Sequence, residues 1–238
     1  MSIAKYLANI DWTATGSMLS GIGTIIGSIA VIYAAHKGAD TFRQWRKQKG
    51  EERRMDLAEQ ILTLAYKLRR AFEHIRSPGM LAGEITEVEV TLTEEGVIDD
   101  DIDLALKSLF VTAQATLSRS KLYKADFEAL LDLMPVAKAI FGDMIAEQLN
   151  VFWQQRARVT VGANSYARLA RVTPPRSTVQ EERQFERREK IEAIIWSGGG
   201  ADGIDPIAVE IDAAIQLLEA QLLPIIRSDA GIRTSSAG

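Results

Sequence analysis

The chain is poor in cysteine and histidine, the residue types most often used as thiolate nucleophile and as general acid or base near neutral pH. It contains no cysteine and two histidines, His36 and His74, among 238 residues. His74 ends a charged run that begins at Arg69 and reads Arg-Arg-Ala-Phe-Glu-His. A histidine transfers protons near pH 7, and a guanidinium stabilises developing negative charge. Arg69 and His74 are therefore the candidate catalytic pair.

The Arg69–His74 spacing, an arginine, four residues and a histidine, resembles the motif of HEPN ribonucleases, helical proteins that pair this motif across a dimer to cut RNA. Arg70 stands where HEPN proteins carry Asn, Asp or His. The resemblance implies that two His74 side chains act as general acid and base on a ribose hydroxyl, while Arg69 stabilises the phosphorane charge. The alternative interpretation is that these charged residues are the solvent-exposed face of an amphipathic helix whose buried face holds Leu68 and Phe72.

Two further patterns resemble ligand sites but lack the residues that bind. The acidic run Asp99–Asp103 begins like a calcium loop, yet it has neither the glycine nor the final glutamate of such loops, so we interpret Asp99, Asp100 and Asp101 as candidate caps of the helix that follows. The glycine run at 197–203 lacks the lysine of phosphate loops, and Asp202 would repel a phosphate, so we interpret it as a hinge. No serine-hydrolase elbow, zinc-protease motif or dinucleotide fingerprint occurs. We therefore expect no metal and no cofactor.

Charge and length restrict the function further. The net charge is −4, from 28 lysines and arginines against 32 aspartates and glutamates. Non-specific nucleic-acid binding needs a basic surface, so nucleic acid is not an expected partner. The length suits one globular domain beside a membrane segment. The absence of cysteine agrees with a reducing compartment.

An uncharged stretch at 13–35 predicts a transmembrane helix, because a bilayer is crossed by about 20 apolar residues. Trp12 and Tyr33 flank it at the positions of an aromatic belt. A buried core helix and a cleaved signal peptide are the two alternatives. We favour an uncleaved anchor because of the charges that follow it.

Basic residues are concentrated behind this stretch, whereas only Lys5 and the amino terminus precede it. Positive charge stays on the cytoplasmic side, so the N-terminus is expected outside a bacterial inner membrane and the remainder in the cytoplasm. The predicted parts are an extracytoplasmic N-terminus at 1–12, a transmembrane helix at 13–35, a basic juxtamembrane segment at 36–54, a cytoplasmic helical domain at 55–227 and a disordered tail at 228–238.

Small residues form one face of the predicted membrane helix at alternating spacings of four and three. Close backbone approach along such a seam favours helix association in lipid, so we predict a homo-oligomer. Hydroxyl side chains lie near the same seam at Thr13, Ser17, Thr24 and Ser28. They either line a narrow polar channel in a higher oligomer or bond back to their own preceding turn. The predicted oligomerisation residues are Gly16, Ser20, Gly23, Gly27, Ala30 and Ala34.

Beyond the bilayer, Phe42 and Trp45 interleave with basic residues. This pattern is typical of a helix lying against anionic lipid headgroups, and nucleic acid is the alternative partner. Lipid is favoured because the segment adjoins the anchor. The predicted headgroup contacts are Arg43, Trp45, Arg46, Lys47 and Lys49.

Apolar residues at helical spacing predict an all-α fold. The one exception is Val88, Val90 and Leu92, which alternate with polar residues like a strand and which we interpret as an extended loop. A final helix is expected to start with Asp205 as its cap and Pro206 in its first turn. The predicted helices of the domain are 51–76, 99–118, 121–134, 136–158, 179–196 and 206–227.

The layout of the chain, with the run Trp45–Pro78 following the anchor, resembles an uncharacterised group of bacterial single-span proteins. It more distantly resembles membrane-embedded helical accessory effectors of phage-defence systems. The second resemblance implies antiviral defence by membrane perturbation, with the helical domain as sensor. Two hypotheses follow. The first is a non-enzymatic, membrane-anchored oligomer that works by contacts with itself or with another cytoplasmic protein. The second is a membrane-tethered HEPN-like ribonuclease.

Overall fold

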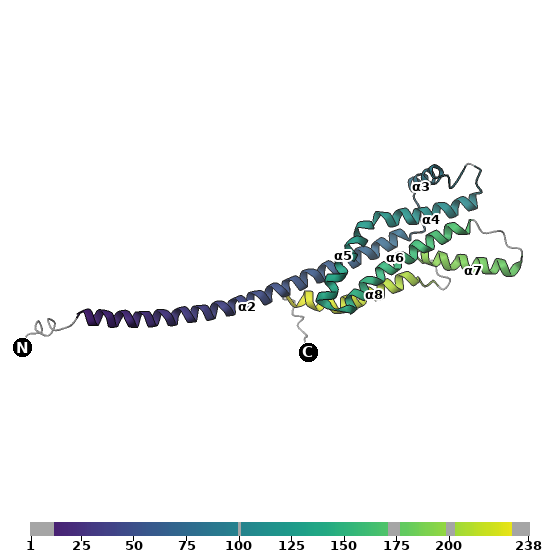
Figure 1. Ribbon diagram of the computed structural model, residues 1–238. Coiled ribbons are helices and arrows are strands. Elements are labelled where there is room, and N and C mark those ends of the chain that lie inside the picture. Colours follow the sequence, from purple (N-terminus) through teal and green to yellow (C-terminus); the bar gives the residue numbers. More distant parts are fainter. Residues whose placement is uncertain (1–11, 100, 171–176, 199–202, 230–238) are drawn as a thin grey trace, which may run out of the picture. The chain divides into compact units, whose positions relative to one another are not determined.

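The computed structural model describes residues 12–99, 101–170, 177–198 and 203–229. All the regular structure in these ranges is α-helical, in seven helices, which confirms the all-α prediction (Figure 1). The chain divides into two compact units, Met1–Arg53 and Arg54–Gly238. The predicted N-terminal segment lies almost entirely outside the described residues.

The first described helix, α2, runs from Trp12 to Ile75, and its 64 residues pass through both units without interruption. The sequence predicted separate membrane, juxtamembrane and domain helices. The structure instead has one continuous helix in their place. The physical reason is the lack of proline before Pro78 and the strong helix formers at 43–54, chiefly Arg, Lys, Gln and Glu. α2 is the one helix within the described ranges that is long and apolar enough to cross a membrane.

The next helix, α3 (Ala82–Glu94), contradicts the loop interpretation of this stretch. Val88 and Leu92, one helical turn apart, are buried together, whereas Val90 between them is exposed. Apolar residues at 88, 90 and 92 fit the two-residue repeat of a strand, but Val88 and Leu92 also fit the 3.6-residue repeat of a helix. The stretch is too short for the sequence to distinguish these two repeats. The helix ends at Glu94, and the positive φ of 68° at Gly96, two residues later, lets the Val97 N–H bond back to the Leu92 carbonyl.

The helix α4 (Leu104–Leu122) starts later than predicted, because Asp103 rather than the preceding aspartates is its cap. The Asp103 carboxylate accepts bonds from the backbone N–H groups of Ala105 and Leu106. Its end follows at Tyr123, which separates it from α5.

The helix α5 (Lys124–Phe141) runs through Pro135, where a break was predicted. Pro135 is on the exposed side, so the carbonyl that loses its N–H partner can bond to water. The chain breaks instead at Gly142, whose φ of 93° is left-handed and favours glycine. The helix α6 (Asp143–Leu169) follows directly.

The last two helices agree closely with the prediction. α7 spans Thr178–Ile195, and α8 spans Pro206–Asp229 with Asp205 capping its first turn through the N–H groups of Ile207 and Ala208. α8 continues two residues into the predicted tail, and 230–238 lie outside the described residues, as do 199–202 of the predicted hinge.

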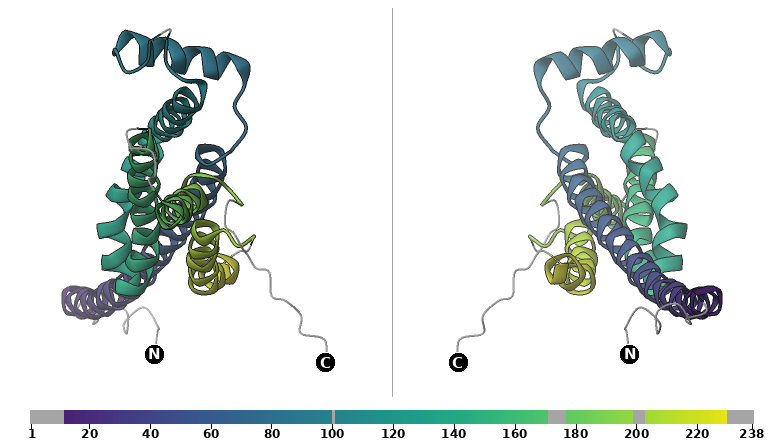
Figure 2. Two further views of the ribbon diagram at one scale, coloured as in Figure 1. Left: turned by 90° about the vertical axis from the view of Figure 1, so that its right-hand side faces the viewer. Right: turned by 90° about the vertical axis from the view of Figure 1, so that its left-hand side faces the viewer.

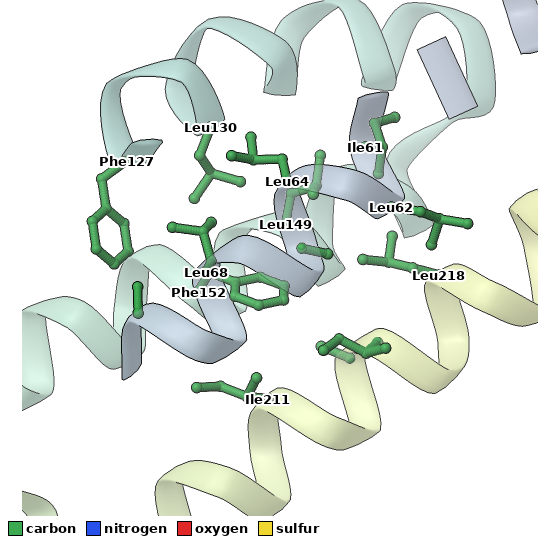
Figure 3. Close-up of a cluster of buried hydrophobic side chains, with 14 of the residues drawn as sticks. Ile61, Leu62, Leu64, Leu68, Phe127, Leu130, Leu149, Phe152, Ile211 and Leu218 are labelled. Carbon is green, nitrogen blue, oxygen red and sulfur yellow. The ribbon is translucent and has the colours of Figure 1, made fainter. Parts of the chain in front are cut away.

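The main core of the second unit lies between α2, α5, α6 and α8 (Figure 3). On α2 the spacing predicted the buried face correctly, since Ile61, Leu68 and Phe72 are all almost fully buried. Figure 3 shows Ile211 and Leu218 of α8 directed at this face of α2. Large apolar side chains that recur every three to four residues are buried against the neighbouring helices, and this burial is the main contribution to the stability of such a bundle.

Two smaller clusters attach the remaining helices. α3 packs across α4 through Val88, Leu92 and Val111 (Figure 2). α7 packs on α6 and α4 through a cluster that includes Tyr166 and Ile195.

Candidate functional site: the apolar segment of α2 and the arginines of the bundle

The apolar segment of α2, here residues 16–35, is exposed along its whole described length. Its large side chains range from 46% exposed at Ile22 to 72% at Leu19. Each square ångström of apolar surface in water costs about 25 cal/mol, so a surface of this kind is stable only when lipid or another protein covers it.

The glycines of the small-residue seam have open space beside them among the described residues. A Cβ added at Gly16, Gly23 or Gly27 would meet no atom within 4 Å. The fold of one copy therefore gives no packing reason for glycine at these positions. Close approach by a second helix is a reason that the seam itself supplies.

The hydroxyls beside the seam bond to the helix that carries them. Thr24 donates to the Ser20 carbonyl at 2.9 Å, and Ser28 donates to the Thr24 carbonyl at 2.8 Å. For these two side chains the structure has the back-bonded arrangement rather than one that offers donors to a channel. The Thr13 side chain lies outside the described residues.

The basic segment at 36–54, predicted to adjoin the membrane, is exposed except at Asp40 and Glu52, which are half-buried. The rings of Phe42 and Trp45 lie together, with centroids 5.7 Å apart and both side chains more than half exposed. Arg43 and Lys47 make long ion pairs, at 3.9 Å, with carboxylates one turn away, and Lys49 pairs with Glu52. Exposed pairs of this type contribute about 0.5 kcal/mol or less, so they do not prevent these cations from turning to another anion.

Arg69 and His74 point to different helices. The Arg69 Nε lies 2.8 Å from the Asp212 carboxylate on α8. The His74 Nδ1 lies 3.0 Å from the Tyr123 hydroxyl, and the two rings meet edge to face. Both side chains are on the exposed face of α2, as the amphipathic interpretation expects. One copy of the chain does not bring the two together, and pairing across a dimer stays a prediction.

Arg76, which the sequence did not single out, is the most buried cation of the bundle at 2% exposure. Its Nη1 donates to both Asp205 carboxylate oxygens at 2.8 Å. Its Nε and Nη2 donate to the carbonyls of Ala193, Ile194 and Trp196 at the end of α7. Arg76 thus joins the end of α2, the end of α7 and the start of α8.

Burial and pairing shift the ionisation of both partners. Burial lowers the pKa of Arg76, against the opposing effect of its bonds to Asp205. Burial raises the pKa of Asp205, but the N–H of Ala208 and the Arg76 guanidinium outweigh it and hold that pKa below its usual value. The depressed carboxyl pKa favours the ionised form of Asp205, and a guanidinium keeps its proton in proteins, so the contact is an ion pair.

Arg119 on α4 has a similar role at the turn that follows α2. It is 5% exposed and binds the Glu84 carboxylate through Nε at 2.6 Å and Nη2 at 2.7 Å. It also donates to the Ser77 and Gly79 carbonyls, and so holds this turn in place. The hydrogen bond from Arg119 lowers the pKa of Glu84.

A cavity of about 130 Å³ opens beside Arg76, and its lining combines apolar residues such as Phe72 and Ile211 with charged ones, among them Arg69, Asp205 and Asp212. Arg69 and Arg76 already have carboxylate partners there, so the cavity is part of the ion-pair network that attaches α8 to α2. No group of three His, Asp or Glu side chains that could hold a metal occurs among the described residues.

The sequence singled out two members of this network, Arg69 as a candidate catalytic residue and Asp205 as a helix cap. The capping role of Asp205 was predicted from its position directly before Pro206 at the start of a helix. Its bond to Arg76 is a second role, which this local signal does not reveal. Arg76 and Arg119 are buried by residues more than 30 positions away, and no local pattern distinguishes them from exposed arginines. No known protein family, curated protein or solved structure matches the chain.

Proposed function

We propose that this chain is a membrane-anchored, self-associating helical protein that works by contacts, as a scaffold or as a defence-type membrane effector. In this proposal the apolar segment of α2 spans a bacterial inner membrane, the N-terminus is outside and the helical bundle is in the cytoplasm. The bilayer and a second copy of the chain are the expected partners, and no catalytic step is required.

One observation carries the proposal. Residues 16–35 form an uninterrupted helix whose described side chains are exposed and uncharged. The mostly buried helices of the bundle contrast with it, since their apolar faces are turned to one another. Seven basic residues against three acidic ones at 36–54 support the orientation with the bundle inside.

Membrane fractionation tests the anchor. Alkaline carbonate removes peripheral proteins, so we expect the full chain to stay in the membrane pellet after extraction. Release into the supernatant would contradict the anchor. A protease added to the outside of spheroplasts should leave the bundle intact, and its digestion would reverse the proposed orientation.

Substitution of the seam glycines by a large side chain tests self-association. We expect Gly23→Ile combined with Gly27→Ile to abolish oligomers detected by chemical cross-linking in native membranes, because the branched side chain keeps the helices apart. Gly21→Ile is the matched control, because Gly21 lies on the opposite, bulky face and also has open space around it. Equal loss in both variants would mean that the seam is not the contact surface.

The ribonuclease alternative stays a prediction. The two hypotheses differ in the effect of the seam substitutions: an effector that works through the anchor loses assembly and activity together, whereas a nuclease that dimerises through its bundle continues to cut RNA.

A further inference from the structure

The outward face of α8 carries no charged side chain along its middle. This face, here called the α8 face, consists of exposed residues at spacings typical of a helix seam: Val209, Ala213, Gln216, Leu217, Ala220 and Pro224. Two of them, Val209 and Leu217, are about half exposed, at 55% and 47%. The same stripe reaches a charged side chain, the exposed Arg227, only in the last turn of α8.

The acidic residues beside the α8 face all bind within their own chain. Glu210 accepts bonds from Gln155 and Arg158 of α6. On the other side, Asp212 pairs with Arg69, and Glu219 accepts a bond from the Tyr66 hydroxyl, both on α2. These contacts hold the carboxylates at the margins of α8 and leave the α8 face between them.

We propose that a second copy of this chain docks on the α8 face, α8 against α8. A contact between identical surfaces places like charges together, so it requires a face whose charges are absent or already paired. The α8 face meets this requirement. Ala213 and Ala220 allow the two helix backbones to approach closely.

Gln216 lies at the middle of the seam and suits a contact with its own copy. Its side-chain amide is both donor and acceptor, so two Gln216 side chains satisfy each other across a two-fold axis. A single central amide is also what fixes the register of paired helices.

The composition of α8 argues against the bilayer as the occupant of the α8 face. The helix has four acidic residues and one basic residue, Arg227, and anionic headgroups would repel it. One face of a 24-residue helix is a small interface, so the contact depends on the anchor to raise the effective concentration of copies. In that respect the inference rests on the proposed function.

The chain has no native cysteine, so single cysteines report contacts without interference. We would place Ala213→Cys, Ala220→Cys, Ala34→Cys in the anchor seam and Ala139→Cys in separate full-length chains and oxidise native membranes. Ala139, an exposed alanine on α5, is the matched control. We expect the two α8 variants to form disulfide-linked dimers at least five-fold more than Ala139→Cys.

Dimers with Ala34→Cys but not with the α8 variants would overturn the α8 contact and leave the anchor association standing. Dimers with the α8 variants but not with Ala34→Cys would support the α8 contact and count against the anchor seam. If the thiol of the Ala213→Cys variant is protected from a water-soluble maleimide without forming dimers, another occupant covers the face and the inference is wrong.

A charge substitution provides an independent test that does not depend on disulfide geometry at residue 213. In a Leu217→Cys background, Ala213→Glu should lower dimer yield several-fold, because two carboxylates then meet at the contact, whereas Ala139→Glu should leave it unchanged. Circular dichroism confirms that each variant retains its helices. Equal yields for the two glutamate variants would contradict the inference.

Discussion

We expect Asp205→Ala to destabilise the bundle far more than the loss of a helix cap explains. Asp205 has two roles in the structure: its carboxylate caps α8 through the N–H groups of Ile207 and Ala208, and it is the only carboxylate that Arg76 binds among the described residues. Asp103 provides a matched control within the same chain. It caps α4 in the same way but lies exposed.

The magnitudes follow from these contacts. Loss of an aspartate cap costs about 1 kcal/mol. Removal of one partner from a buried ion pair costs about 3–5 kcal/mol, because it leaves the other charge uncompensated. Asp205 retains 14% exposure, which favours the lower end of that range. We therefore expect a loss of about 4 kcal/mol for Asp205→Ala and about 1 kcal/mol for Asp103→Ala.

The assay is urea unfolding of the full chain in detergent, followed by far-ultraviolet circular dichroism. Asp205→Asn adds a third point, because asparagine caps a helix as well as aspartate does but carries no charge, so its cost should fall between the other two. Equal destabilisation by Asp205→Ala and Asp103→Ala would refute the reasoning. It would mean that the buried guanidinium of Arg76 finds water or another acceptor.

Three further predictions address other contacts. The bond from Arg119 lowers the pKa of Glu84, and the N–H of Ala208 and Arg76 lower the pKa of Asp205 against the effect of burial. A carboxyl whose folded pKa is depressed stabilises the fold above its unfolded pKa, so unfolding free energy should fall below about pH 4, and an acid titration that leaves it constant would contradict this. Gly162→Ala should lower the melting temperature, because the new Cβ would lie 2.9 Å and 3.2 Å from methyl groups of Ile194 and Ile195, whereas Gly83→Ala, in open space, should not. If the ribonuclease hypothesis is right, His74→Ala abolishes RNA cleavage by the full chain, and Tyr123→Phe, which removes the hydroxyl 3.0 Å from the His74 Nδ1, lowers the cleavage rate; unchanged cleavage after His74→Ala removes the hypothesis.

Local signals predicted the parts of the fold that depend on neighbouring residues. The apolar residues that recur at alternating spacings of three and four identified the buried face of α2, namely Ala58, Ile61, Ala65, Leu68 and Phe72. The predicted end of that helix, residue 76, is one residue past the observed end at Ile75. Asp205 and Pro206 marked the start of α8 correctly. Each of these depends on contacts within a few residues, which the sequence displays directly.

The remainder depends on position in the fold. The alternation at Val88, Val90 and Leu92 fits both a strand and a helix, and only packing against α4 decides between them. Pro135 interrupts a hydrogen bond but not the helix, because water can reach the carbonyl. Arg76 and Arg119 are buried through partners on other helices, and an arginine near a helix end is ordinarily exposed.

The bond between Arg76 and Asp205 joins residues 129 positions apart, and this separation determines when the bundle can close during synthesis. A ribosome needs on the order of ten seconds to extend the chain from one residue to the other. During that interval the apolar face of α2 that α8 later covers has no α8 to bind, while the N-terminal end of α2 has already left the ribosome. The nascent bundle therefore exposes this apolar surface until its last helix is made. Chains that stop before Asp205 should be the ones that chaperones retain and proteases remove.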